Sequence, residues 1–445
     1  MISAFSILFA SALLSLLFHR TIWLKPFTLI ALVIGMCLSG TAIGISGFET
    51  SQATSLFEFI LQWVLFALVL HDKNETSITQ ILFIGAASIA LLQSSTLISF
   101  VISFEALSII SMVLVSQIRT PDQAEGAIKM FIAGAISTGI LLLGTAFYLM
   151  GGGMLDKAID IHADGFASMG IVIMLFGVFY KLTIVPMHGW AMDTYTLIRH
   201  SHAGLLTGVA KTVVAVATFK IFSGFLAVQI EMGILLLAFL SVLTMTLGNF
   251  LALFQTQISR ILAYSSIAHA GYILLAFVGV KSSYASTGLL YMAIAYIFMQ
   301  TAVFLLLDTL AHRYNIKSLD DLNGLGKANR VLAFFFTVQL FSLAGIPLLA
   351  GFLAKAVVFY AVVDAGLWYI VLIALLNSAL SVGYYAWIIK HIYFDKPSTL
   401  FAQEQTDKHK TGKYANEKLS ILSQSMLLLG TVFFGIFASL VFSVI

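Results

Sequence analysis

Four ionisable side chains interrupt long apolar stretches of this sequence. They are Glu105 in VISFEAL, Lys181 in VFYKLTIVP, Lys211 in GVAKTVV and Lys355 in GFLAK. A charge at the centre of a bilayer costs about 2.5–3.5 kcal/mol even on a lenient scale, so such groups usually face a bundle interior and mark an ion pathway. Because one glutamate cannot neutralise three lysines, we interpret the four groups as a proton relay rather than as snorkelling residues or structural ion pairs.

Histidines form a second candidate group. His269, in SSIAHAGY, lies well inside an apolar run and is a candidate fifth relay member, although a lone helical histidine is as often a packing residue. His188, His200 and His202 gather with Arg199 near the end of one predicted helix. No carboxylate or cysteine stands at the spacing of a metal site, so we interpret this group as an interfacial polar cluster.

Two further charged positions receive structural interpretations. Lys129 follows Glu125 by one helical turn near a helix start, which favours an ion pair between them. Asp308 sits at the end of its predicted span. Glu105 is therefore the only acid expected near a membrane centre.

The composition excludes a water-soluble globular protein. Of the 445 residues, 60% are hydrophobic and 10% are charged, against roughly 25% charged residues in ordinary soluble domains. The net charge of +3 is too balanced to indicate a nucleic-acid partner. The only cysteine, Cys37, lies in an apolar run, so we expect no disulfide, thiolate metal site or iron–sulfur cluster. Phosphate-binding loops are also absent from the sequence.

The apolar runs predict an all-α polytopic membrane protein with about fourteen transmembrane helices. The predicted helices are 2–18, 26–47, 55–70, 77–94, 97–117, 124–150, 168–187, 202–224, 231–255, 258–280, 284–310, 330–351 with a continuation to about 363, 367–392 and 419–443. The first run lacks a basic leader and a cleavage site, so we expect a retained helix. The polar stretch 395–417 predicts a solvated linker.

The basic residues predict an orientation. Sixteen of the 23 Lys and Arg residues fall in joints after odd-numbered helices, and only three fall in the opposite joints. Cytoplasmic loops carry the excess of positive charge in membrane proteins. We therefore expect basic cytoplasmic loops and both termini outside.

Helix breakers lie beside two of the buried lysines. Pro186 follows Lys181 in YKLTIVPMHGW, and Pro347 and Gly351 precede Lys355 in SLAGIPLLAGFLAK. Interrupted spans at corresponding places in two halves are typical of inverted-repeat transporters, in which freed backbone groups line a hydrated site.

The two breaks are five spans apart, which predicts a repeated five-helix unit within a single transmembrane domain. Helices 4–8 (77–224) would form the first repeat and helices 9–13 (231–392) the second. Residues 1–76 would supply three leading helices and 419–443 the final one. This arrangement places the two lysines beside the breaks at equivalent positions.

Six segments between about residues 97 and 394 carry a family resemblance through their order and spacing. They are VISFEALSIISMVLV, AEGAIKMFIAGAISTGILLLGTAFYLMGGG, FYKLTIVPMHGWAMDTY, MTLGNFLALFQTQISRILAYSSIAHAGYILL, SLAGIPLLAGFLAKAVVFYAVV and SALSVGYYAWIIKHIYF. Together they closely resemble subunit N of proton-pumping NADH-quinone oxidoreductase, respiratory complex I. Related antiporter-like subunits occur in Mrp cation/proton antiporters, energy-converting hydrogenases and some inorganic-carbon transporters.

The resemblance implies two inverted five-helix repeats with discontinuous helices 7 and 12. It also implies that Glu105 pairs with Lys181, that Lys211 is the central lysine of helix 8 and that Lys355 faces the exit half-channel. His269 matches a position in the central hydrophilic axis. Quinone reduction in neighbouring subunits would perturb the Glu–Lys pair and drive a proton outward.

The resemblance further implies that this chain holds no redox cofactor. Quinone, flavin and iron–sulfur clusters would belong to partner subunits, including other antiporter-like subunits, in a prokaryotic plasma (inner) membrane. An Mrp-type antiporter subunit or a subunit of a related hydrogenase or ion-coupled transporter is the alternative. A structural subunit with a vestigial charged axis is a third reading, against which the four charges and both breaks argue.

One segment departs from the family pattern. After the motif around Pro186 the family usually carries a proline and a GAP triplet, but residues 191–206 read AMDTYTLIRHSHAGLL, with Met192 at the proline position. We therefore expect a different loop geometry near Lys211.

Overall fold

The structure, a computed structural model, describes residues 3–17, 23–41, 48–72, 74–117, 120–228, 231–398, 401 and 415–442. Within these ranges the chain is helical, with two isolated β-bridges and no longer strand. In the described part of the chain, eleven helices are long and apolar enough to cross a membrane. The all-α membrane fold is therefore confirmed. Most of the predicted linker 395–417 lies outside the described residues.

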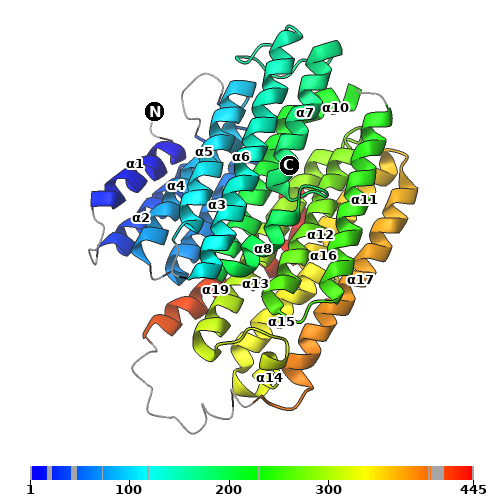
Figure 1. The fold of residues 1–445 in the computed structure, drawn as a ribbon. Coiled ribbons are helices and arrows are strands. Elements are labelled where there is room, and N and C mark those ends of the chain that lie inside the picture. Colours follow the sequence, from blue (N-terminus) through cyan, green and yellow to red (C-terminus); the bar gives the residue numbers. More distant parts are fainter. Residues whose placement is uncertain are drawn as a thin grey trace.

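The N-terminal helices form one flank of the molecule (Figure 1). They are α1 (Ala4–Leu17), α2 (Leu24–Cys37), α3 (Gln52–His71), α4 (Glu75–Gln93), α5 (Leu97–Val115) and α6 (Pro121–Met150). Side-chain caps start several of them: Ser51 and Thr96 each form a capping box, and Thr120 accepts a backbone hydrogen bond just before a proline at the first helical turn.

Helices at the middle of the sequence carry Lys181 and Lys211, two of the predicted relay residues. They are α7 (Gly165–Leu182), α8 (Gly189–Leu197), α9 (His200–Gly204), the π-helical turn η1 (Leu205–Ala210) and α10 (Lys211–Val228). The last three form one continuous span of residues 200–228. A π-helical turn inside a span is uncommon and is frequent at functional sites.

The C-terminal helices build the core and the opposite flank. They are α11 (Glu231–Leu253), α12 (Ile258–Val278), α13 (Ala285–Tyr314), the 3-10 turn η2 (Asp320–Leu322), α14 (Leu325–Ala328), α15 (Arg330–Ala344), α16 (Ala350–Asp364), α17 (Trp368–Tyr393), α19 (Ala415–Ile436) and α20 (Ala438–Phe442). The apolar stretches of α12 and α13 are 100% and 94% buried inside the protein, so these two helices form the centre of the bundle.

Close helix pairs depend on glycine. A side-chain carbon on Gly144 or Gly170 would meet backbone atoms across the α6–α7 interface at 2.5 Å and 2.3 Å, and one on Gly248 would meet α12 at 2.5 Å. Small residues let helix backbones approach closely in membranes, where apolar surface alone does not drive association.

All fourteen predicted runs coincide with helices. The second is shorter than the predicted 26–47, because α2 ends at Cys37 and Gly40 takes a left-handed conformation with φ 86°. The last run is divided at residue 437 between α19 and α20. The repeat boundaries and the orientation of the termini stay predictions.

Candidate functional site

The first interruption follows α7. The helix ends at Leu182, and Thr183 takes a left-handed conformation with φ 60° and ψ 36°. The amides of Thr183 and Ile184 turn back to the carbonyls of Tyr180 and Phe179 at 3.2 Å and 3.0 Å. Pro186 then falls in the non-helical segment before α8, where a residue without a backbone donor is tolerated.

Helix α11 supports this segment from the side. The Val185 amide donates to the Thr244 hydroxyl at 3.0 Å, so one backbone group freed by the interruption is satisfied by a side chain. Trp190 of α8 donates its indole N–H to the Tyr180 carbonyl at 3.1 Å. The end of α7 is thus held by both neighbouring elements.

The second interruption separates α15 from α16. Gly345, with φ 89°, ends α15, and Pro347 follows in the connecting segment. Lys355 reaches back from α16 and donates to the carbonyls of Leu343 and Ala344 at 3.1 Å and 3.0 Å. A cation at the C-terminal end of a helix satisfies unpaired carbonyls and complements the helix dipole.

Gly351 differs from its expected role. It lies inside the first turn of α16, and Gly345 supplies the left-handed turn instead. A side-chain carbon at Gly351 would stand 1.8 Å from the carbonyl oxygen of Ser342. Gly351 therefore permits α15 and α16 to pack closely and does not break a helix.

Replacing Gly351 with alanine should destabilise the bundle, because the two helix ends must separate to admit a methyl group. We expect a loss of about 1–3 kcal/mol, as for other overpacked sites, measured by thermal unfolding of the purified protein in detergent. Gly139→Ala is the matched control, since nothing lies within 4 Å of its added carbon. Equal stability of the two variants would contradict the packing argument.

The two lysines beside the interruptions are not equivalent. Lys181 lies in the last turn of α7, before its interruption, whereas Lys355 lies in the second turn of α16, after its own. The expectation of equivalent positions is therefore not met. Lys355 is buried and is bonded to the interruption itself, while Lys181 is half-buried.

Lys211 begins α10 directly after the π-helical turn and is 1% exposed. Its Nζ donates to the hydroxyl of Thr183 at 2.8 Å and to the hydroxyl and carbonyl of Ser266 at 2.7 Å and 3.1 Å. A lysine ammonium has three hydrogens, and these three bonds use all of them. The first interruption and α12 are thereby joined through one buried amine.

His269 lies on α12 between the buried lysines and is 0% exposed. Its Nδ1 is 2.9 Å from the Ser265 carbonyl, which only accepts, so Nδ1 carries a hydrogen in this contact. Nε2 is buried without a hydrogen-bond partner. The ring stacks on Tyr296 at 5.2 Å, and the Tyr296 hydroxyl donates to Ser266 at 3.0 Å.

The same helix reaches Lys355. Ser266, His269 and Tyr272 follow one another at three-residue steps, which places them on neighbouring turns of α12. The Lys355 ammonium lies over the Tyr272 ring at 5.0 Å and donates to the Ser378 hydroxyl at 3.0 Å. One side of α12 therefore extends from the Lys211 site to the Lys355 site.

Glu105 and Lys181 are the two remaining residues of the predicted proton relay. Glu105 is half-buried on α5; its Oε2 accepts from the Thr138 hydroxyl at 2.8 Å, and its Oε1 is buried without a partner. Both Glu105 and Lys181 are among the described residues, and no direct ion pair joins them. They influence one another only as separated charges.

Sequence reasoning missed a hydrogen-bond network between α11, α12 and α17. The Tyr384 hydroxyl donates to Asn249 at 3.1 Å, and the Asn249 amide donates to the Tyr272 hydroxyl at 3.4 Å and to the Asn377 carbonyl at 3.0 Å. The network holds the ring that lies under Lys355. The sequence shows polar residues on these three spans, but it does not show which of them pair.

A buried charged cluster at the ends of α3 and α13 was also missed. Asp308 is 2% exposed and accepts from His71 at 3.0 Å and from the Ser201 amide at 3.3 Å. Arg199 pairs with Asp72 at 2.9 Å and with Asp308 at 3.8 Å. The departing segment 191–206 therefore contributes to a charged cluster at the start of the span that carries Lys211.

The remaining polar predictions have mixed outcomes. The ion pair of Lys129 with Glu125 is confirmed at 2.6 Å, and Asp193 of α8 joins it as a second partner. His202 contacts the Ser77 hydroxyl at 3.1 Å, whereas the Nδ1 atoms of His188 and His200 are buried without partners. These histidines do not share one set of contacts.

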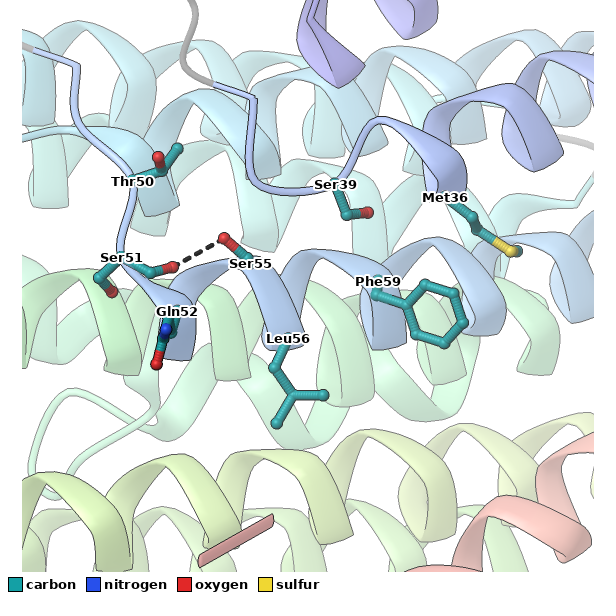
Figure 2. A pocket seen from close by; sticks show the side chains of 8 residues that line it. All are labelled: Met36, Ser39, Thr50, Ser51, Gln52, Ser55, Leu56 and Phe59. Carbon is teal, nitrogen blue, oxygen red and sulfur yellow. Dashed lines mark hydrogen bonds between the residues drawn. The ribbon is translucent and has the colours of Figure 1, made fainter. Parts of the chain in front are cut away.

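A surface cavity of about 570 Å³ lies apart from all these groups, between α2 and α3 (Figure 2). Small polar and apolar side chains line it: Met36, Ser39, Thr50, Ser51, Gln52, Ser55, Leu56 and Phe59. None of these lining residues is ionisable, so the cavity contributes no acid or base to the buried axis.

Residues 94–381 match the family described as "NADH:quinone oxidoreductase/Mrp antiporter, TM". The chain is 33% identical over 342 residues to F(420)H(2) dehydrogenase subunit N of Methanosarcina mazei, covering 73% of this chain and 69% of the relative. It is 31% identical over 413 residues to NADH-quinone oxidoreductase subunit N of Flavobacterium johnsoniae, covering 86% and 88%.

Two solved assemblies contain chains with the same fold. A chain of respiratory complex I from Thermus thermophilus superimposes with a TM-score of 0.81 at 23% identity, over 99% of this chain and 98% of that one. A chain of the Mrp complex from Dietzia sp. DQ12-45-1b superimposes with a TM-score of 0.84 at 17% identity, over 99% and 95%.

Proposed function

The chain belongs to the family of membrane subunits shared by NADH:quinone oxidoreductases and Mrp antiporters, and from this premise we propose that it is a proton-translocating subunit of a complex I-type assembly. Quinone reduction in partner subunits would supply the energy. The chain itself would move protons and carry out no redox step.

One observation carries the proposal: Lys211, His269 and Lys355, three buried acid–base groups, all lie on or against one side of α12. Lys211 is bonded to α12, and the same side of α12 carries His269 and reaches the ring under Lys355. Buried ionisable groups in membrane helices are costly and mark proton relays. His269 lies on this side of α12, and its buried Nε2 makes no hydrogen bond to the described residues.

The proposed direction of transfer follows from the arrangement of charges. Glu105 and Lys181 are half-buried at one end, where a neighbouring subunit could alter their charge, whereas Lys211 and Lys355 are nearly inaccessible. A change in the Glu105–Lys181 interaction would move a proton to Lys211, through His269 to Lys355, and then out. Each step transfers one proton between neighbouring bases.

An Mrp-type antiporter subunit is the second candidate. The fold likeness to the Dietzia Mrp chain favours it, because that chain superimposes over 95% of its length. An antiporter would use the same buried groups without redox partners. Identity of about 30–35% to subunits N of quinone oxidoreductases favours the first candidate.

Co-purification separates these candidates. The tagged full-length chain is extracted from its native membrane in mild detergent, its partners are identified by mass spectrometry, and quinone reduction is assayed. Iron–sulfur and quinone-site subunits in the purified complex would support the redox-driven pump. Isolation alone or only with antiporter-type subunits would overturn it in favour of ion exchange.

Neutralising Lys181 or Glu105 should reduce proton pumping while the complex still assembles. For Lys181→Ala and Glu105→Gln we expect proton translocation per electron pair through this chain to fall by about tenfold, at least, because a charged relay member is lost. The side chains make no direct ion pair that the fold depends on. Acidification of inverted vesicles is measured against NADH oxidation in the same sample.

Lys129→Ala is the control for these variants. Lys129 is also on a spanning helix, but its two carboxylate partners lie near the start of α6 and on α8, away from the buried groups that lie along α12. Unchanged pumping is expected. Intact assemblies that pump normally without Lys181 and without Glu105 would remove both residues from the relay.

A further inference from the structure

Thr183 occupies a backbone position that ordinarily favours glycine. Its φ of 60° is left-handed, a region that β-branched residues rarely adopt, and its side chain is 0% exposed. At the second interruption the corresponding helix end is occupied by Gly345, with φ 89°. Strained conformations of this kind persist where the surrounding structure holds them and often accompany function.

The side chain of Thr183 supplies a reason for this choice. Its hydroxyl oxygen accepts a hydrogen bond from the Lys211 ammonium at 2.8 Å. Across the described residues this is its only side-chain hydrogen bond, so the hydroxyl hydrogen is not donated to another protein group. Glycine would permit the turn but could not provide this oxygen.

The bonding of Lys211 depends on its protonation state. The ammonium donates three hydrogens to three acceptors, which are the Thr183 hydroxyl and the hydroxyl and carbonyl of Ser266. A neutral amine has two hydrogens and one lone pair, so one contact must reverse. The Ser266 carbonyl cannot donate, so the donor must be one of the two hydroxyls, and of these only that of Thr183 belongs to the segment that follows Lys181.

The Thr183 hydroxyl is suited to that reversal, because no group in the described part of the chain accepts its hydrogen. It also stands two residues after Lys181, beyond the last turn of α7. The backbone amide of Thr183 is bonded to Tyr180 in that same turn. The residue therefore connects the end of α7 that carries Lys181 with the amine of Lys211.

We propose that the Thr183 hydroxyl relays the proton between Lys181 and Lys211. A proton leaves Lys181 through an intervening water and forms a new O–H bond on Thr183. The original Thr183 hydrogen passes to the lone pair of neutral Lys211 as its own O–H bond breaks. One positive charge moves from Lys181 to Lys211, no electron is transferred, and the hydroxyl is regenerated.

This inference rests on the proposed function and assigns a path between two of its members. It also explains why the first interruption carries a threonine at a left-handed position. The turn needs only a permissive backbone, but the relay needs an oxygen that both accepts and donates.

Three substitutions separate the hydroxyl from the backbone conformation. Thr183→Val keeps the shape and removes the hydroxyl, Thr183→Ser keeps the hydroxyl, and Thr183→Gly relaxes the left-handed turn and removes the hydroxyl. Each is introduced into the full chain in its native membrane. Acidification of inverted vesicles is measured per electron transferred between pH 6 and pH 9, with assembly checked by native electrophoresis.

We expect Thr183→Val and Thr183→Gly to lower proton translocation through this chain by about a hundredfold, the weak end of what a positioned proton-transfer group contributes. Thr183→Ser should restore it and keep the pH profile of the unmodified protein. If Thr183→Gly pumps normally, the hydroxyl is unnecessary and the inference is wrong. Normal pumping by an assembled Thr183→Val protein would also show that the hydroxyl is unnecessary.

The Lys211→Met variant distinguishes failure of this inference from failure of the proposed function. Loss of pumping in Lys211→Met together with normal pumping in Thr183→Val would overturn only the role of the hydroxyl. Normal pumping in both would overturn the relay as a whole. If Thr183→Val fails to assemble, Thr183→Gly and Thr183→Ser still give the comparison.

Discussion

Replacing Lys211 with methionine should slow proton transfer through this chain by about a hundredfold or more, the range that a positioned acid–base group contributes. Methionine has a similar length and is apolar, so it fills the site without adding a charge. It leaves Thr183 and Ser266 without their shared donor and interrupts the line of bases between Lys181 and His269. Pumping per electron is measured in vesicles, alongside NADH oxidation.

A lysine on the same helix provides the control. Lys220 is exposed in the middle of α10, and among the described residues its ammonium donates to the backbone carbonyls of Glu49 and Leu92, at 3.4 Å and 3.2 Å. Lys220→Met should therefore assemble and pump normally. Equal pumping in the Lys211 and Lys220 variants would show that no proton passes through the buried amine.

The second large effect is expected at Asp308. Removing its carboxylate by Asp308→Ala leaves His71, Arg199 and the Ser201 amide without their shared acceptor in a buried site. Loss of one partner from a buried ion pair costs about 3–5 kcal/mol. We expect lower accumulation in the membrane and a lower unfolding temperature in detergent.

Asp320 is the matched acidic control for this stability measurement. Its side chain is 88% exposed, and it is 3.8 Å from His391. Exposed pairs contribute about 0–1 kcal/mol, so Asp320→Ala should unfold close to the unmodified protein. Comparable unfolding temperatures for the two alanine variants would mean that the cluster at Asp308 does not stabilise the bundle.

This cluster also gives the departing segment 191–206 a structural role. This segment, which lacks the usual GAP triplet, includes Arg199 and Ser201, and both contact Asp308. Asp308 lies 107 positions from Ser201 and 237 positions from His71. No local pattern indicates such a pairing, because the segments meet only after the spans have packed.

The outcomes at the two interruptions show how far breaker residues can be interpreted. Pro186 and Pro347 lie in segments that are not helical, where the missing backbone donor of proline is tolerated. Gly351 was misassigned, because glycine is used both for left-handed turns and for close helix contact. Thr183 carried no signal, as nothing in its type indicates a left-handed backbone.

Hydropathy and charge by themselves determined the helical class, the positions of the apolar helices and the five ionisable groups that lie within them. These properties are local, because each span must satisfy its own backbone hydrogen bonds and its own cost of entering the bilayer. Tertiary structure decided which groups meet. Lys211 contacts residues 28 and 55 positions away, and Lys355 turns back onto the helix before its own. Those contacts depend on helix packing and on the backbone angles at Thr183 and Gly345, which hydropathy does not encode.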